Sequence, residues 1–299
     1  MKRTYALTFV GIAGALWASS GVAVQDFFAH SNKSAMDLTN IRMVISGLIM
    51  LILTCRHGRL TRNLTILKER PKMWLEVAVY GIIGIALVQF SYFEGISIGG
   101  AVPTTVIQYS CPAMIVLWNS VYNKKMPKFG EVLAAALAMI GVLLLVTGGK
   151  LDALLVPLSC VFWSLMSGAS FAFASIFPKH LFAVHIDQYF LTSVGMIIGG
   201  LFTFILVDEI NWLPFFNADV VFDVSWIIIF GTVAAFLLFN VGLRYLTPEE
   251  ASVTATTEPL ASVIISYFMF GTAFGLVESL GIVFVITAIL VPIFIDNRN

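Results

Sequence analysis

Ten long apolar stretches divide this chain and leave little choice of fold. Each is close to the roughly 20 residues that an α-helix needs to cross a membrane. Only helices and closed barrels satisfy their backbone hydrogen bonds in lipid, and stretches this long are typical of helices. They lie at about 5–29, 36–54, 73–95, 97–121, 130–147, 154–177, 187–207, 225–246, 250–270 and 276–295. The sequence therefore predicts an all-α membrane protein with ten transmembrane helices.

The composition agrees with this interpretation. Charged residues make up 11% of the 299 residues and the mean hydropathy is +0.94, whereas about a quarter of a soluble domain is charged. The net charge of zero gives no indication of a nucleic-acid partner. The basic start followed by an apolar run is similar to a signal peptide, but the run is too long, and we interpret it as a retained first helix.

The basic residues predict the orientation, because inside loops are enriched in Lys and Arg. With the N-terminus inside, the loop 55–72 and its six basic residues also lie inside. Of the 17 Lys and Arg, only Lys33 and Lys150 fall in outside loops. The outside loop 208–224 carries four acids and no base. We expect a plasma-membrane protein with both termini cytoplasmic.

A shift of 147 residues aligns the two halves of the chain without a gap from residue 84 to residue 278. The matches include two glycines, a proline and a glutamate that opens a helix, which are unusual residues to match by chance. The pairs are Gly84–Gly231, Gly95–Gly242, Val106–Val253, Pro112–Pro259, Val116–Val263 and Glu131–Glu278. Because five helices precede the midpoint, the second half enters from the opposite side. We expect two inverted five-helix repeats, 1–149 and 150–299, around a central cavity.

The two matched prolines interrupt helical hydrogen bonding near the middle of their spans. Pro112 cannot donate to the carbonyl of Gln108, and Pro259 cannot donate to that of Ala255. Unpaired carbonyls at that depth are tolerated beside protein partners or a wet cavity. The symmetric pair favours a cavity, with a kink used only for packing as the alternative.

Glu258 lies near the middle of the ninth expected helix, about 12 Å from one end of a span of about 30 Å. It has no basic neighbour in the sequence. Ionisable groups at that depth are costly and usually face a cavity. The same helix carries a polar stripe at four-residue spacing, with Glu250, Thr254, Ser262 and Ser266 on one face. We expect Glu258, Thr254 and Ser262 to bind substrate; a structural hydrogen bond is the alternative for Glu258.

These features give the chain a resemblance to the drug/metabolite transporter superfamily, specifically to its EamA-type carriers. The residues that carry the resemblance are Trp17, Arg42, Pro112, Gly130-Glu131, Glu258-Pro259 and Glu278. It implies that helices 1–4 and 6–9 surround a central cavity, that helices 5 and 10 are peripheral, and that the protein exports or exchanges small metabolites.

Further candidates for substrate binding follow from their depth in the expected helices. Trp17 and Trp163 lie mid-span, away from the interfacial belts where tryptophan is usually found. Gln89 and Asn240 are deep amides that either line the cavity or join helices. The remaining candidates are Tyr92, Gln108, Tyr109 and Tyr189, and Cys111 occupies the position that matches Glu258.

Glu258, Asp26 and Arg42 are candidates for coupling to protons or sodium ions. Burial favours the neutral form of a carboxyl group, so Glu258 is suited to carry a proton. Three interpretations of Arg42 remain open: its side chain extends to the outer interface, it pairs with an acid such as Asp26, or it meets an anionic group. We expect no metal site, no cofactor and no catalytic residues, because the four His and three Cys lack ligand spacing.

The function that these observations favour is secondary active transport of a small organic metabolite by alternating access. One central acid surrounded by aromatic faces suits a cation, so an amine, a quaternary ammonium or an amino acid is the favoured substrate. An exporter of another small metabolite or drug is the alternative within this class. An enzyme acting on lipid head groups and a channel or scaffold are the rivals outside it. We expect a monomer or a homodimer.

Overall fold

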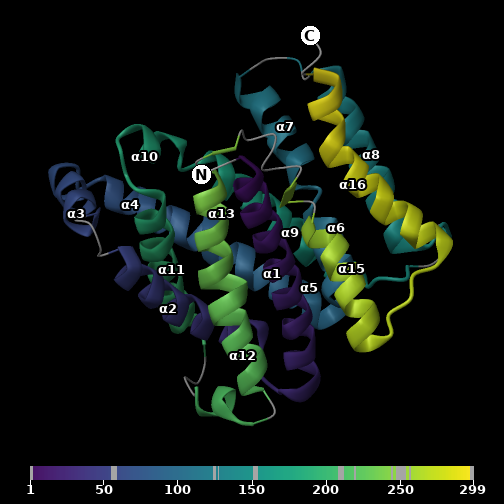
Figure 1. Ribbon diagram of the computed structural model, residues 1–299, viewed down its shortest axis with the longest axis horizontal. Helices are drawn as coiled ribbons and strands as arrows, with labels where there is room; N and C mark the ends of the chain where they lie inside the picture. The colour runs from purple at the N-terminus through teal and green to yellow at the C-terminus, as the bar shows by residue number, and fades with distance from the viewer. Residues whose placement is uncertain are drawn as a thin grey trace.

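The computed structural model describes residues 3–54, 59–123, 126, 128–150, 154–207, 212–218, 220–243, 245–246, 254–255 and 257–296. Every regular element in these ranges is a helix (Figure 1). Eight helices of the described residues are long and apolar enough to cross a membrane, and Thr257–Phe270 and Leu276–Val291 are shorter apolar helices. The prediction of an all-α membrane protein is therefore confirmed. Arg56, Lys124, Lys125, Arg244 and Glu250 lie outside the described ranges.

The described residues of the first half form nine elements. They are α1 (Arg3–His30), α2 (Ala35–Thr54), α3 (Arg59–Glu69), α4 (Met73–Val79), η2 (Tyr80–Ala86), α5 (Leu87–Gly99), α6 (Ala101–Gln108), α7 (Cys111–Asn123) and α8 (Phe129–Thr147). The second half contains α9 (Leu158–Ile176), α10 (Lys179–Ala183), α11 (Gln188–Leu206), η3 (Leu213–Phe216), α12 (Val221–Ile228), η4 (Ile229–Ala234), α13 (Ala235–Leu243), α15 (Thr257–Phe270) and α16 (Leu276–Asp296).

Three boundaries differ from those predicted. The third span runs to Gly99 rather than to residue 95, and the chain turns at Gly100, whose φ of 86° favours glycine. The fourth span is divided into α6 and α7 by a turn at Tyr109 and Ser110. The expected loop after the second span contains the helix α3. The amphipathic pattern of this segment is short, and the sequence did not predict it as a helix. Each difference is a local backbone event inside an apolar or polar run that hydropathy alone does not resolve.

Two π-helical segments, η2 and η4, interrupt the third and eighth spans. Gly84 lies in η2 and its matched partner Gly231 lies in η4. Each allows close approach to the first helix of the other half, Gly84 to Ala174 of α9 and Gly231 to Ser20 of α1. Wide turns of this kind occur often at functional sites, so the matched glycines mark matched backbone irregularities.

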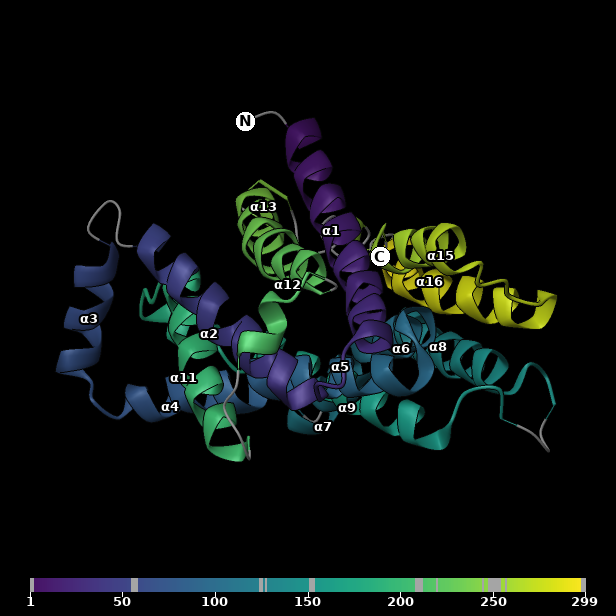
Figure 2. The ribbon, with the colours of Figure 1, turned by 90° about the horizontal axis from the view of Figure 1, so that it is seen from below.

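The helices form two layers with a pair at one edge. Figure 2 shows α1, α12, α13 and α15 on one side of the molecule and α4, α5 and α9 on the other. α1 packs between α13 and α15, and α9 packs against α5 and α6. α2 packs against α11, and α8 packs along α16 at the right edge of Figure 1. This arrangement places α5, α6, α13 and α15 beside the interior.

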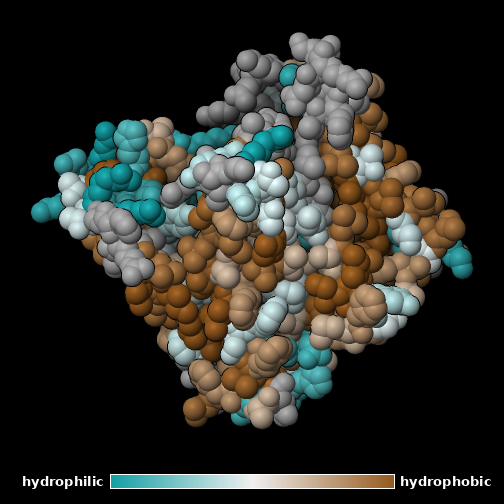
Figure 3. All heavy atoms as spheres, viewed as in Figure 1, coloured by the Kyte–Doolittle hydropathy of each residue, from teal (hydrophilic) through white to brown (hydrophobic). Residues whose placement is uncertain are grey.

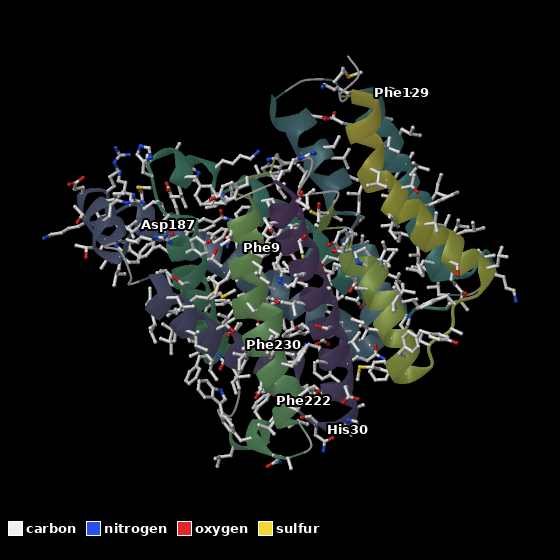
Figure 4. The ribbon with its side chains drawn as sticks, viewed as in Figure 1. Phe9, His30, Phe129, Asp187, Phe222 and Phe230 are labelled. Carbon is white, nitrogen blue, oxygen red and sulfur yellow. The ribbon has the colours of Figure 1, made fainter. Side chains whose placement is uncertain are left out.

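A cluster of basic residues lies at one end of the molecule. Arg59, Arg62, Lys68 and Arg70 belong to α3 and the turn after it, and hydrophilic atoms cover this corner in Figure 3, whereas apolar atoms cover the middle of the same face. α1 begins and α16 ends toward the same side (Figure 1). Figure 4 places Asp187 toward this side and His30 toward the other. We call these the basic end and the opposite end.

The seam between α8 and α16 gives a first prediction. A Cβ atom on Gly281 would lie 2.6 Å from the carbonyl oxygen of Gly141, closer than backbone atoms allow. We expect Gly281→Ala to lower the free energy of unfolding by about 1–3 kcal/mol, the usual cost of overpacking. The measurement is the thermal unfolding temperature of the purified protein in detergent.

Gly11→Ala is the matched control for this prediction. Its new Cβ atom would lie 3.7 Å from Thr254 Cγ2, an ordinary contact, and alanine has the higher helix propensity. We expect it to unfold at the wild-type temperature or above. Equal unfolding temperatures for the two variants would contradict the close backbone packing of α8 on α16.

Candidate functional site

Glu258 and Tyr109 form a hydrogen bond in the interior. Tyr109 Oη lies 2.9 Å from Glu258 Oε2 and also 2.9 Å from the carbonyl oxygen of Ala255, so its single proton is shared between these two acceptors. The Glu258 side chain is buried, with 9% of its surface exposed. Two candidates predicted from different halves of the chain are therefore brought into contact.

Local backbone structure explains how Tyr109 reaches α15. α6 ends at Gln108, and Tyr109 lies in the turn before α7. Pro112 is the second residue of α7 and Pro259 the third residue of α15, positions where a missing N–H removes no helical bond. The carbonyl of Ala255, which Pro259 leaves without a helical donor, accepts from Tyr109. The carbonyl of Gln108 packs against Gly168 of α9. Both carbonyls therefore lie against protein.

Arg42 is held inside the bundle by three neutral groups. Nε donates to Thr232 Oγ1 at 2.7 Å, one terminal nitrogen donates to Gln89 Oε1 at 2.7 Å, and the other donates to the Gly231 carbonyl at 3.2 Å. The guanidinium also lies 5.1 Å from the ring centre of Phe93. With 4% of its surface exposed, Arg42 does not extend to the outer interface, which was one of the three interpretations.

Thr232 and Gly231 are site residues that sequence reasoning missed. Both belong to η4, and Thr232 Oγ1 also donates to the carbonyl of Ile227 at 2.7 Å. The π-helical backbone therefore presents a hydroxyl and a carbonyl together to Arg42. The only sequence signal was the matched glycine at position 231, which indicated a close approach but not its partner.

Glu258 has a basic counterpart that the sequence did not reveal. The charges of Arg42 and Glu258 attract each other across the interior. Tyr92 lies close enough to interact electrostatically with both. The acid was expected to be without a basic neighbour, which is true only along the sequence. Among the described residues, the base is Arg42 of α2 and the acid is Glu258 of α15, and both are buried.

The remaining central candidates mostly join helices. Tyr92 Oη lies 2.7 Å from Thr105 Oγ1, and Gln108 Nε2 donates to Ser167 Oγ at 2.6 Å. Gln89 holds Arg42. These contacts join helices, which was the alternative given for Gln89, and substrate binding by these side chains stays a prediction.

The two mid-span tryptophans lie in aromatic clusters. Trp17 packs 5.5 Å from Phe236 and 5.0 Å from Phe239, between α1 and α13. Trp163 packs 5.2 Å from Phe90, between α9 and α5. Each therefore joins the first helix of one half to a helix of the other half.

The polar stripe of α15 is buried and partly without hydrogen bonds. Ser262 and Ser266 have 0% and 1% of their surface exposed, and their hydroxyls have no partner among the described residues. They follow Glu258 at four-residue spacing on one face of α15. Thr254 lies near Gly11 of α1. Unbonded buried hydroxyls on this face are the polar groups that a solute or water next to Glu258 would meet.

Tyr189, Asn240 and Asp26 lie away from this centre. Tyr189 and Asn240 line a pocket at the basic end whose volume is about 370 Å³. Asp26 Oδ2 lies 3.6 Å from His30 Nδ1. Asp26 therefore pairs at the opposite end rather than with Arg42.

The described residues contain no group of His, Cys, Asp and Glu arranged to hold a metal ion. Cys111 and Cys160 are buried free thiols. The chemistry of the central site is therefore that of one carboxyl, one guanidinium and several hydroxyls and amides, all placed at helix junctions.

These features define a multi-pass membrane protein with a charged, hydrogen-bonded interior. A family model described as the EamA-like transporter family matches residues 4–147 and again residues 158–294. The chain belongs to the EamA-like transporter family, and the predicted resemblance is confirmed. Family membership makes it a membrane transporter.

Three relatives carry transporter names. An uncharacterized inner membrane transporter of Salmonella typhimurium, YicL, is 29% identical over 300 residues, covering 96% of this chain and 94% of its own. An uncharacterized transporter of Archaeoglobus fulgidus is 22% identical over 90% of both chains. The uncharacterized transporter YwfM of Bacillus subtilis is 24% identical over 97% of this chain and 94% of its own.

One solved crystal structure shares the fold of this chain. It is 15% identical, and it covers 99% of both chains with a TM-score of 0.66. At that identity the likeness concerns the fold alone.

The position of Arg42 gives a second prediction. Replacement by Gln leaves Thr232, Gln89 and the Gly231 carbonyl with fewer donors and leaves Glu258 without its buried counter-charge. We expect Arg42→Gln to lower the free energy of unfolding by about 2 kcal/mol or more, measured as thermal unfolding in detergent. Arg70→Gln, an exposed arginine, should unfold at the wild-type temperature. Arg42→Gln unfolding together with that control would contradict a structural role for Arg42.

Proposed function

We propose that this protein is a secondary carrier that moves a small organic solute by alternating access between two inverted five-helix halves, residues 1–149 and 150–299. The family model matches each half separately. The matched glycines 84 and 231 lie in matched π-helical segments, and each half packs its first helix against the third span of the other. Together with the two shorter apolar helices, the eight spans agree with ten crossings. These observations support a duplicated carrier.

The observation that carries the proposal is the bond between Tyr109 and Glu258. It joins a break in a span of the first half to α15 of the second half, at the centre of the interface between halves. A motion that opens this interface on either side must stretch or exchange this bond. Substrate binding at Glu258 would therefore change a contact between the two halves.

We propose that the substrate carries a positive charge, as an amine, a quaternary ammonium or an amino acid. A cation beside Glu258 would replace the distant Arg42 as the counter-charge, and the aromatic rings of Tyr92 and Tyr109 add faces that attract cations. Protons or sodium ions are the candidate coupling ions, with Glu258 as the coupling group. Thr254 and the unbonded hydroxyl of Ser262 extend the same polar face.

The substitution Glu258→Gln tests this proposal. It keeps the shape and can still accept a hydrogen bond from Tyr109, but it removes the charge. We expect it to abolish counterflow of solute in proteoliposomes while the protein remains folded and elutes as the wild type does. The probes are phenylalanine, phenethylamine and choline, one for each favoured class. Tyr109→Phe should reduce the rate about tenfold, as expected for one lost hydrogen bond to a charged group.

Glu76→Gln is the control, because Glu76 pairs with His180 at an exposed position of the basic end. Wild-type exchange by Glu258→Gln would exclude the proposed role of Glu258. Exchange of none of the three probes by the wild type would exclude the proposed substrate class. A pH-gradient dependence that survives Glu258→Gln would exclude proton coupling through this residue.

Two other functions remain to be distinguished. An exporter of another metabolite or drug would show saturable counterflow with other solutes but not with these probes. An enzyme that acts on lipid head groups would release product from phospholipid vesicles. The family and the transporter names of its relatives favour transport over catalysis.

The proposed location is the plasma membrane with both termini cytoplasmic and the basic end inside. Impermeant maleimide applied to intact cells should label Lys150→Cys but not Lys68→Cys, which should react only after permeabilisation; Cys55 is replaced in both. The reverse labelling would invert the orientation. The carrier is proposed to act as a monomer or homodimer, which light scattering of the detergent-solubilised protein would decide.

A further inference from the structure

The pocket at the basic end is built from three separate parts of the chain. Its volume is about 370 Å³, in the range of small-molecule sites. Its lining comes from α3, from α10 and the start of α11 with the connection between them, and from α13. The lining residues are Arg62, Phe182, His185, Ile186, Asp187, Gln188, Tyr189 and Asn240. Figure 4 shows Asp187 where this connection meets α11. Most of these side chains are polar, although the pocket reaches into a bundle of apolar helices.

The walls of this pocket are fixed by hydrogen bonds. The Asp187 carboxylate caps α11 by accepting from the backbone N–H groups of Tyr189 and Phe190. The backbone N–H of Asp187 donates to Asn63 Oδ1 at 2.8 Å, which ties the connection to α3. Arg62 donates to the carbonyl of His185, a residue whose φ of 69° shows a tight, defined turn. The shape of the pocket is therefore set before any ligand arrives.

Asn240 is a buried amide in the pocket wall without a hydrogen bond to the described part of the chain. Both its Oδ1 and its Nδ2 lack a partner, although only 4% of the residue is exposed. An unpaired buried amide is costly, and buried polar groups in folded proteins are nearly always bonded. By contrast, the buried amide of Asn40 bonds to the Gly200 carbonyl, Thr203 and Trp212. Asn240 is suited to bond a molecule inside the pocket.

The charge around the pocket favours an anionic group. Arg62 lines it, Arg59 lies 5.5 Å from the ring centre of Tyr189, and α11 directs the positive end of its dipole toward it. Asp187 contributes the opposite charge, but its carboxylate accepts from the backbone of α11. A planar guanidinium is well matched to carboxylate or phosphate oxygens.

We propose that this pocket is a second solute site, at which a small molecule bearing a carboxylate or a phosphate binds with that oxyanion toward Arg62. Asn240 bonds a further polar group of the same molecule. The site lies on other elements than Glu258 and does not depend on its role. At this site the transporter would bind solute at the basic end. The site selects solutes that carry an oxyanion.

Paired probes that differ only in the oxyanion test the proposal. Binding of phenylalanine, phenethylamine, phosphoethanolamine and ethanolamine is measured by calorimetry on the full-length protein in nanodiscs. We expect at least one probe with an oxyanion to bind about tenfold more tightly than its partner amine. The phenylalanine pair reports on a carboxylate and the phosphoethanolamine pair on a phosphate. Equal binding within both pairs, or no binding of either oxyanion probe, would overturn the proposal.

Two substitutions assign the binding to this pocket. Arg62→Gln should weaken binding of the oxyanion probe about threefold to fivefold, because an exposed charge contributes modestly. Asn240→Leu should weaken it about tenfold. Arg70→Gln, outside the pocket, should bind as the wild type does. Unchanged binding by both pocket variants would place the solute elsewhere and overturn the assignment.

Thermal unfolding separates a ligand-binding role of Asn240 from a structural one. Asn240→Leu removes an unbonded buried amide, so its unfolding temperature should equal or exceed that of the wild type. Asn40→Leu breaks three hydrogen bonds and should unfold at a lower temperature. An equal loss in both variants would show that Asn240 is a structural residue, contrary to the proposal. In a Glu258→Gln background, Arg62→Gln and Asn240→Leu should still weaken binding of the oxyanion probe, so a failure of the proposed role of Glu258 can be told apart from a failure of this proposal.

Discussion

Two opposite charges buried among apolar helices constrain the rest of this structure. A charge without partners in such an interior costs several kcal/mol, so the fold must surround each with polar groups. Arg42 is surrounded by Gln89, Thr232 and the Gly231 carbonyl, and Glu258 by Tyr109. These contacts fix the relative positions of α2, α5, η4, α6 and α15. The hydrophobic helices could pack in many ways, but few of them would satisfy both charges at once.

Most of these polar contacts join the first half of the chain to the second. Tyr109 bonds to Glu258, and Arg42 bonds to Gly231 and Thr232 of η4. The proposed alternating-access mechanism requires two packings of similar free energy, and hydrogen bonds between the halves are suited to that exchange because new partners can replace old ones. The apolar seam of Gly141 and Gly281 between α8 and α16 lies at the edge, away from these bonds. The two halves thus meet through polar contacts in the interior and through an apolar seam at the edge.

The sequence was sufficient to predict the helical class, most spans and the central position of Glu258 and Tyr109, because length, hydropathy and depth are local properties. It did not predict that Arg42 meets Thr232, 190 residues away, since nothing in an apolar pattern specifies which helix faces which. It also grouped Tyr189 and Asn240 with Glu258, whereas they line a pocket at the basic end. The eighth span runs over Val221–Gly242 rather than over 225–246, so Asn240 lies near its end and not deep within it. The direction in which each residue faces also requires the packed structure.

The π-helical segments are one reason why the sequence does not predict which way each side chain faces. Successive residues of an α-helix are about 100° apart around its axis, and a wide i→i+5 turn admits one extra residue. Everything after η2 or η4 is therefore rotated in phase by about one residue relative to the helix before it. Gln89 and Tyr92, which follow η2, point to the interior only because of that offset. A regular α-helix through either segment, with every residue kept, would turn the polar side chains beyond it by about 100° and point them away from the interior.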